Sequence, residues 1–202
     1  MLKEGHGCGQ HGEDRILHFV FKDYSAGWLV DVGAADGYYN SNSAVLLQRP
    51  NWHGILIEPE PSQFEKLKEM HKDNPRVTCV QCAIGQNEGF KTFYCGGQVS
   101  TFEKEVKRSS EVNHGIKYTE MKMEVKTLSR VLTENNCPRE IDFMSIDVEG
   151  MNYEAWQSLN PFSYSPKLVC MEGSKYTMTG YKEFCRLGAN TFYLREDLCK
   201  TL

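Results

Sequence analysis

The stretch LVDVGAADGY, residues 29–38, constrains the fold more than any other part of the chain. An apolar run ends at Asp31, and two glycines, Gly33 and Gly37, follow it closely. Glycine tolerates positive φ and lets a ligand come close to the backbone. Polar residues after the turn can then cap a helix over the apolar run 44–47. A strand, a glycine turn and a helix in succession are typical of nucleotide-binding open α/β sheets.

Short apolar runs alternate with amphipathic stretches along the rest of the chain, which predicts a parallel sheet covered by helices. At 202 residues the chain fits one domain, and no repeat or linker divides it. We expect a single domain over 1–202, with 1–27 as an entry segment and helix. Strands are predicted at 28–32, 54–58, 77–84, 90–94, 121–125, 141–147, 167–172, 181–187 and 191–194. Helices are predicted at 14–22, 43–48, 61–71, 127–134 and 153–159.

The segment 96–120 breaks this pattern. It is polar, charged and without a clear hydrophobic period. A connection of this length inside a compact domain is often a lid or a substrate-binding loop. A disordered surface excursion is the alternative interpretation.

Charge and hydropathy argue against several kinds of partner. The net charge is −4 and the basic residues do not cluster, so we expect no nucleic-acid partner. No apolar run approaches the roughly 18 residues that a membrane span needs. The first residues lack the apolar core of a signal peptide. We therefore expect a soluble, cytoplasmic protein.

The eight cysteines are scattered, and several lie in apolar runs, which is typical of reduced, buried thiols. Cys79 and Cys82 form the only CxxC, and no second pair completes a zinc site. His6, Cys8 and His11 are further candidate ligands, but a glycine-rich chain start is the simpler interpretation. We expect no structural metal.

The glycine spacing discriminates between two classes of cofactor. A dinucleotide turn reads G-x-G-x-x-G and seats a pyrophosphate at a helix N-terminus. Here Gly33 and Gly37 are spaced G-x-x-x-G, with Asp31 before the turn and Asp36 inside it. Two acids would repel a pyrophosphate but suit a ligand with a cationic amine and no phosphate. S-adenosylmethionine is such a ligand, and we predict it in preference to NAD.

Glu58 ends the second predicted strand, 21 residues after Gly37. An acid at this position can accept hydrogens from both ribose hydroxyls. NAD-binding proteins use the same acid, so Glu58 alone does not discriminate between the cofactors. A solvated strand end before Pro59 is the alternative, and the glycine turn upstream favours the ribose role.

Several segments of the chain follow one known sequence pattern, in the same order. They are GQHGEDRIL (9–17), VDVGAADGYYNSNSAVLL (30–47), WHGILIEPEPSQFEKL (52–67), IDFMSIDVEGMNYEAW (141–156) and LGANTFYLRED (187–197). The first is similar to an entry helix, the second to a cofactor turn, and the third to a second strand ending in Glu-Pro. The fourth matches an Asp-x-Glu-Gly signature, and the fifth a closing strand. Together they resemble the FkbM-type methyltransferase family, of class I S-adenosylmethionine-dependent architecture.

The resemblance implies a Rossmann-like α/β fold, with a mostly parallel seven-stranded sheet flanked by helices and an antiparallel final strand. It also implies O-methylation of a hydroxyl on a small molecule or glycan, with S-adenosyl-L-methionine as cofactor. The segment between Glu172 and Tyr181 departs from the family, because it is too short for the usual helix. The predicted cofactor-binding residues are Asp31, Gly33, Ala34, Asp36, Gly37, Glu58, Pro59, Cys82, Ala83 and Asp147.

Methyl transfer to a hydroxyl needs alignment of the oxygen with the methyl carbon and a base for the proton. Asp147 ends a predicted buried strand at the ligand-binding edge of the sheet, and Glu149 follows it. Glu172 after the next strand and His114 in the segment 96–120 complete the predicted catalytic set, in which Glu149 is the first choice. The alternatives are structural roles for Asp147 and Glu149, or a divalent metal shared between them.

Two other functions stay open at this point. A non-catalytic S-adenosylmethionine-binding or scaffold module would keep the fold and lose the chemistry. A NAD-dependent oxidoreductase is disfavoured by the glycine spacing.

Overall fold

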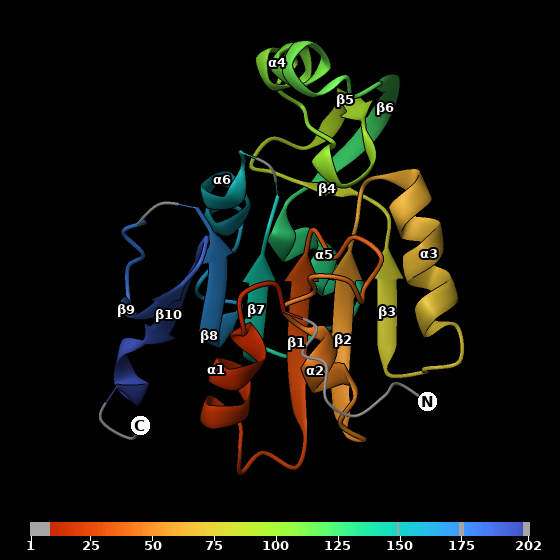
Figure 1. Cartoon of the computed structure of the whole chain (residues 1–202). Helices are drawn as coiled ribbons and strands as arrows, with labels where there is room; N and C mark the ends of the chain where they lie inside the picture. The colour runs from red at the N-terminus through yellow and green to blue at the C-terminus, as the bar shows by residue number, and fades with distance from the viewer. Residues whose placement is uncertain (1–8, 149, 174–175, 200–202) are drawn as a thin grey trace.

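The computed structural model describes residues 9–148, 150–173 and 176–199. A large sheet stands between two layers of helices, and a small second sheet lies above it (Figure 1). Within the described residues the large sheet has seven strands in the order β3-β2-β1-β7-β8-β10-β9. These strands are β1 (Gly27–Val32), β2 (Trp52–Ile57), β3 (Val77–Val80), β7 (Glu140–Ile146), β8 (Ser165–Glu172), β9 (Tyr181–Leu187) and β10 (Asn190–Arg195).

The pairing of the strands is parallel except at one end of the sheet. β1 pairs in parallel with β2 and β7, and β3 and β8 continue the parallel pairing outward. β10 runs antiparallel to both β8 and β9. The expected mostly parallel seven-stranded sheet with an antiparallel end is therefore confirmed.

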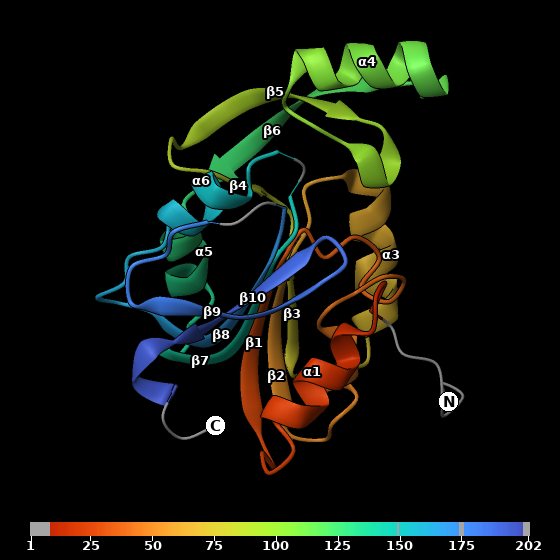
Figure 2. The same ribbon diagram turned by 60° about the vertical axis from the view of Figure 1, so that its left-hand side comes forward.

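Helices cover both faces of the large sheet, as Figure 2 shows. One face packs against α1 (Glu13–Val20), α2 (Ala44–Leu47) and α3 (Pro61–His71), and the other against α5 (Leu128–Glu134) and α6 (Asn152–Gln157). Successive side chains of a strand point to opposite faces, so Leu29 joins the first core and Val30 the second. Both faces are buried, which explains why the central strands read as continuous apolar runs.

The second sheet has the strand order β4-β6-β5 and lies over the carboxyl ends of β1 and β2 (Figure 1). Its elements are β4 (Ala83–Ile84), β5 (Gly89–Cys95) and β6 (Thr119–Lys126), and Phe93, Met123 and Val125 pack in its own core. The prediction of one strand over 77–84 is wrong. After Val80 the chain leaves the large sheet, because Ala83 and Ile84 pair with β6 instead.

The segment 96–120 contains a helix that the sequence pattern did not indicate. It forms η1 (Gly97–Val99) and α4 (Lys104–His114), and no residue of α4 is buried. Charged side chains hold the helix, since Lys107 lies 3.8 Å from Glu111 and 3.0 Å from Glu120. Gly115 ends it in the left-handed conformation. A helix without a buried face has no apolar period to detect.

The remaining elements follow the predictions closely. The closing hairpin lies at β9 and β10, and η2 (Glu196–Leu198) follows it. Across the described residues between β8 and β9 there is no helix, in agreement with the short segment noted in the sequence. No helix of the described chain has the length and apolar character needed to cross a membrane. The seven cysteines of the described part are free thiols.

Candidate functional site

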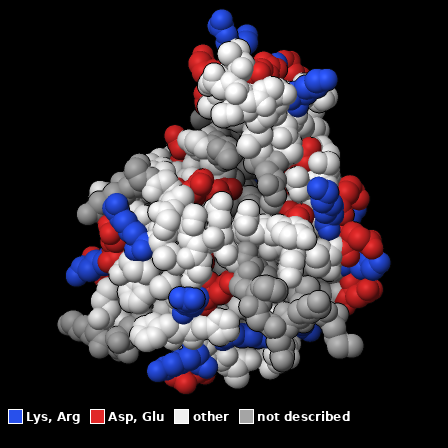
Figure 3. Space-filling view, viewed as in Figure 1, with Lys and Arg blue, Asp and Glu red and all other residues white. Residues whose placement is uncertain are grey.

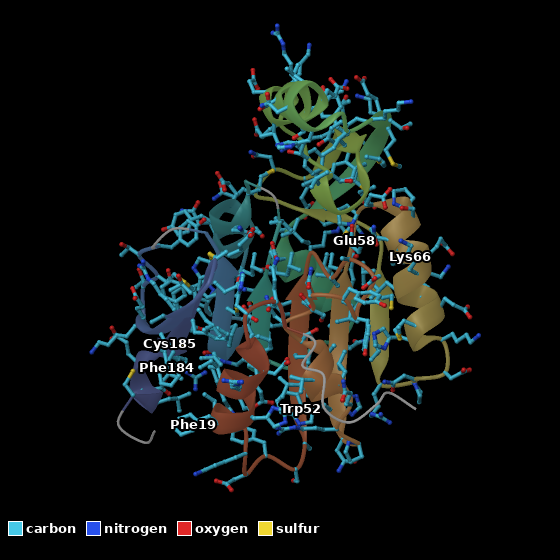
Figure 4. The ribbon with its side chains drawn as sticks, in the orientation of Figure 1. Phe19, Trp52, Glu58, Lys66, Phe184 and Cys185 are labelled. Carbon is cyan, nitrogen blue, oxygen red and sulfur yellow. The ribbon has the colours of Figure 1, made fainter. Side chains whose placement is uncertain are left out.

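A cavity of about 300 Å³ lies at the carboxyl ends of the central strands, below the second sheet. Figure 4 places Glu58 at this end of β2 and Trp52 at the opposite end. The large sheet contributes residues from the ends of β1, β2, β7 and β8 and the start of β10. The second sheet and the segment after η1 add Phe93, Thr101 and Phe102. Open α/β sheets bind ligands at this edge.

The turn after β1 depends on Gly33 for its positive φ, as expected, and also for a close backbone contact that the sequence did not indicate. Gly33 has φ 86° and donates its N–H to the Ile57 carbonyl at 2.9 Å. A Cβ built on Gly33 would overlap the carbonyl oxygen of Asp147. The glycine therefore permits close contact between the ends of β1 and β7, and a side chain there would meet backbone first.

Asp31 is a buried carboxylate in the wall of the cavity. Its Oδ2 accepts a hydrogen bond from the Ser43 hydroxyl at 2.5 Å. Burial raises the pKa of Asp31 to about 6, and hydrogen bonds from Ser43, Ser145 and Ser41 oppose that shift. A cationic group in the cavity would stabilise the ionised form.

Glu58 is the second buried carboxylate of the cavity. Its Oε2 accepts from the Ala35 N–H at 2.8 Å and its Oε1 from the Glu60 N–H at 2.7 Å. Burial raises the pKa of Glu58 to about 7, although these two backbone hydrogen bonds lower it. Each oxygen retains a free lone pair, so the oriented carboxylate can accept two further hydrogens.

The polar residues before α2 have two roles: one binds the start of the helix, and another presents a polar atom to the cavity. Ser41 Oγ accepts from the N–H of Ala44, the first residue of α2, at 3.1 Å, so one of the polar residues after the turn binds the start of the helix as expected. Asn42 donates to the Ser145 hydroxyl at 3.4 Å, and its buried Oδ1 has no partner within the described structure. Because Asn42 also lines the cavity, this oxygen is available to a ligand hydrogen.

Asp36 and Gly37 do not line the cavity, although the sequence placed both in the cofactor turn. Asp36 Oδ1 accepts from the N–H groups of Tyr38 and Tyr39 at 3.0 and 2.9 Å, which closes the loop locally. A Cβ on Gly37 would crowd Leu67 of α3. Both residues therefore support the conformation of the turn on its side away from the cavity.

Two predicted catalytic acids lie on the neighbouring strands of the same edge. Asp147 follows β7 and donates its backbone N–H to the Val32 carbonyl at 2.9 Å, while Glu172 ends β8. Both line the cavity. Asn152 braces the two strand ends, because it accepts from the Val148 N–H at 2.6 Å and donates to the Glu172 carbonyl at 3.0 Å.

Of the other two predicted catalytic residues, one lies away from the cavity and one lies outside the described residues. His114 is exposed on the last turn of α4 and is not among the lining residues. Glu149 lies outside the described residues. Its role stays a prediction.

Ala34, Pro59, Cys82 and Ala83, all predicted to contact the cofactor, form part of the wall. Burial raises the pKa of the Cys82 thiol to about 12. The thiol is therefore protonated at neutral pH and acts as a small apolar surface.

The entry segment closes the cavity beside β10. Glu13 is fully buried and accepts from the His11 N–H at 2.7 Å and from Asn190 Nδ2 at 2.8 Å. Gln10 and Asn190 line the cavity at this end. Glu13, within the segment GQHGEDRIL (9–17), thus holds one wall of the site in place.

The lining is acidic. Asp31, Glu58, Asp147 and Glu172 contribute carboxylates, and the lining residues within the described structure include no lysine, arginine or histidine. The described chain also holds no group of three or more metal-ligating side chains. On the face shown in Figure 3, lysine and arginine are scattered among acidic side chains. The arrangement accepts hydrogens and favours neutral or cationic ligands.

Sequence reasoning missed the contribution of Gln63, Ser145 and Asn190 to the cavity. Gln63 carried one signal, because it lies four residues before Leu67 and so on the apolar face of α3. A polar residue on a buried face needs a partner. Ser145 lies inside a predicted strand and Asn190 lies between the predicted strands 181–187 and 191–194, where a polar residue gives no comparable signal.

Comparison with known proteins gives a family match. The model of the methyltransferase FkbM domain matches residues 31–174. No curated protein sequence matches the chain. Residues beyond the match, including Gln10 and Asn190, also line the cavity.

Solved structures share the fold at low sequence identity. The methyltransferase FkbM from Methylobacillus flagellatus is 16% identical with a TM-score of 0.46, and the alignment covers 74% of this chain but 33% of that one. The chain thus spans about a third of that protein's length. A protein described as the methyltransferase yhhF of Escherichia coli is 11% identical, with a TM-score of 0.55 and coverage of 96% and 91%. One described as the methylase HI0767 of Haemophilus influenzae is 10% identical, with a TM-score of 0.51 and coverage of 91% and 87%.

Proposed function

This chain belongs to the methyltransferase FkbM domain family, and we propose that it is an S-adenosylmethionine-dependent methyltransferase acting on a hydroxyl of a small molecule or glycan. The observation that carries the proposal is Glu58. It is a buried carboxylate at the end of β2, held by two backbone N–H groups in the wall of an acidic cavity. A preorganised acceptor of this kind suits a pair of ribose hydroxyls.

The cavity residues fit the remaining parts of the cofactor. Asp31 and the unpartnered Oδ1 of Asn42 can accept hydrogens from the methionine ammonium, and Asp31 also supplies the opposite charge. Cys82 and Ala83 offer apolar surface for the adenine ring. S-adenosylmethionine supplies, when bound, a methyl group that its positive sulfur activates.

The acidity of the lining supports an uncharged acceptor. A further anionic group on the acceptor, beyond the cofactor's own amino-acid carboxylate, would lie among four acids with no basic side chain to compensate it. Polar acceptors such as Asn190 suit the hydrogens of a hydroxylated molecule. We infer that the acceptor is a neutral alcohol or sugar.

Asp147 and Glu172 are the described residues that can take the proton of the acceptor hydroxyl. Both are carboxylates at the carboxyl ends of adjacent parallel strands, and both reach the cavity. The Asp147 carbonyl lies against Gly33 of the turn after β1, which supports a role for this acid near the cofactor. Glu172 lies one strand further from the turn, on the side of Asn190. Among the described residues we assign proton acceptance to one of these two acids, and Glu149, the first choice from the sequence, stays the alternative.

The test is transfer of label from S-adenosylmethionine to a panel of neutral glycosides and alcohols, each paired with its phosphorylated or carboxylated counterpart. We expect transfer to the neutral members only. The variants Asp147→Asn and Glu172→Gln each replace an acid by its amide. The variant that removes the catalytic base should have a turnover lower by roughly 10²–10⁴-fold, while its cofactor affinity changes little. Glu154→Gln, an exposed site on α6, is the control.

Three results would contradict parts of the proposal. Preferential transfer to the anionic members would refute the neutral acceptor. Unchanged turnover in both acid variants would remove Asp147 and Glu172 from the chemistry. Cofactor binding without transfer to any member of the panel would favour the alternative of a non-catalytic module.

A further inference from the structure

Gln63 places an amide in the cavity from the first turn of α3. The residue is only 7% exposed. Its backbone N–H donates to the carboxylate of Glu60, the N-cap of the helix, at 2.8 Å. Lys66, less than one turn later, lies on the exposed side of the same helix (Figure 4). Gln63 is therefore buried at the start of the helix, whereas Lys66 faces solvent.

The amide oxygen of Gln63 is buried and has no hydrogen-bond partner in the described structure. Buried polar atoms are almost always satisfied, by protein groups, by water or by a ligand. An orphaned acceptor in the wall of a ligand-binding cavity points to a hydrogen that the ligand brings.

The surroundings of Gln63 are apolar and suit a flat ring. α3 packs against η1, and a Cβ on Gly97 would lie 3.8 Å from the Gln63 Nε2. The other lining residues from this side of the cavity are mainly apolar, namely Pro59, Ala83, Ile84, Phe93, Val99 and Phe102. Apolar walls with one polar group at a defined place are typical of sites that bind an aromatic ring in one orientation.

The strand order separates Gln63 from the methionine end of the site. Glu58 belongs to β2, and the acceptors Asp31 and Asn42 follow β1 on one side of it. Gln63 and Ala83 follow β2 and β3 on the other side. A nucleoside whose ribose binds Glu58 and whose amino-acid part extends toward β1 therefore has its base on the side of Gln63.

We propose that Gln63 reads the adenine ring, with its amide oxygen accepting a hydrogen from the 6-amino group. The amide of glutamine carries an acceptor and a donor side by side, which complements the amino group and adjacent ring nitrogen of adenine. This inference rests on the proposed function, because it names the residue that selects the base of that cofactor.

The test is a calorimetric titration with S-adenosylhomocysteine and with its 6-deamino purine analogue. The wild-type protein should bind S-adenosylhomocysteine about tenfold more tightly, the scale of one buried hydrogen bond. Gln63→Met keeps the length and apolar character of the side chain and removes the amide. It should bind both ligands with the affinity that the wild-type protein has for the purine analogue.

Gln157→Met is the matched control, because Gln157 is an exposed amide on α6 whose Oε1 accepts a hydrogen bond from Gln86 Nε2 at 2.8 Å, away from the cavity. It should keep the tenfold preference. Equal affinity of the wild-type protein for the two ligands would overturn the inference without any variant, and so would an undiminished preference in Gln63→Met. A wild-type protein that binds neither ligand would instead refute the proposed function.

Discussion

The two buried carboxylates Asp31 and Glu58 destabilise the folded protein on their own, but they can stabilise a bound ligand. Each is buried, each has a raised pKa, and neutral donors such as Ser43 and the Ala35 N–H hold them. A buried charge with only neutral partners destabilises the fold. At a binding site the same charge can stabilise a cationic ligand, which makes such residues functional candidates.

Replacement of Asp31 tests this balance. Its folded pKa of about 6 exceeds the ordinary value, so protonation stabilises the folded state below about pH 4, and this contribution is lost as the pH rises toward 6. Asp31→Asn should therefore raise the free energy of unfolding at pH 8, by up to about 3 kcal/mol, and change it little at pH 4. Urea unfolding at the two pH values measures the effect.

The same variant should bind S-adenosylhomocysteine at least tenfold more weakly, because the opposite charge for the ammonium is gone. Asp73→Asn, at an exposed position after α3, is the control for both measurements. A loss of stability at pH 8 in Asp31→Asn would show that the charge is not a burden to the empty protein.

The Gly33 turn gives a second prediction at this scale. Gly33→Ala should cost more than about 3 kcal/mol of stability, because it adds backbone overlap with Asp147 to the cost of positive φ. Gly180 has a similar φ of 81° and open space around its Cβ, so Gly180→Ala isolates the conformational cost at about 1–2 kcal/mol. Equal losses in denaturant unfolding would mean that the overlap is absorbed without cost.

At the scale of the element, apolar periodicity predicted the strands and helices that bury a face. It could not predict which sheet a strand joins, so β3 and β4 were read as one run. It also could not reveal α4, which is held by charged pairs around Lys107. Gly115 ends α4, and a glycine is typical of helix ends, but it indicates a helix end only where a helix is already predicted.

The residues of the candidate site also fall into those that the sequence could predict and those that it could not. Asp31, Glu58 and Asp147 could be predicted, because each ends an apolar strand and the carboxyl ends of parallel strands share one edge. Asn190 reaches the cavity through tertiary contacts that no local pattern encodes, and Gln63 carries only the weak signal of a polar residue on an apolar helix face. Asn190 is positioned by Glu13, which precedes it by 177 residues in the chain.

Hydrogen exchange tests which elements bind the ligand. S-adenosylhomocysteine should slow amide exchange in the turn 33–42 and in the segment 97–102, because both line the cavity. α4 should exchange rapidly with or without ligand, since it buries no residue. β9, at the far edge of the sheet, serves as the internal control. Protection of α4 in place of 97–102 would contradict this assignment.

At the scale of the whole molecule, the fold gathers acids at one end of the sheet. Four carboxylates line a single cavity, and two of them titrate near neutral pH in the empty protein. A cationic ligand binds the ionised forms, so its binding must release protons when the pH lies below about 7.

Cofactor affinity should therefore be highest above pH 7.5 and fall as Glu58 and then Asp31 become protonated. We expect a loss of more than tenfold between pH 8 and pH 5.5. Titrations in buffers of different ionisation enthalpy should show proton release near pH 6.5. An affinity that does not vary with pH would mean that neither carboxylate contacts the ligand.

The most direct test of the account is a calorimetric titration of S-adenosylhomocysteine into the wild-type protein and Glu58→Ala at pH 8. The account predicts one ligand per chain and an affinity weakened by about 1.5–3 kcal/mol, roughly ten- to 150-fold, in the variant. Glu65 is an exposed acid on α3, the helix that follows Glu58 in the chain. The control variant Glu65→Ala should bind the ligand with the affinity of the wild-type protein. No binding heat at millimolar ligand, or an unchanged affinity in Glu58→Ala, would contradict the central claim.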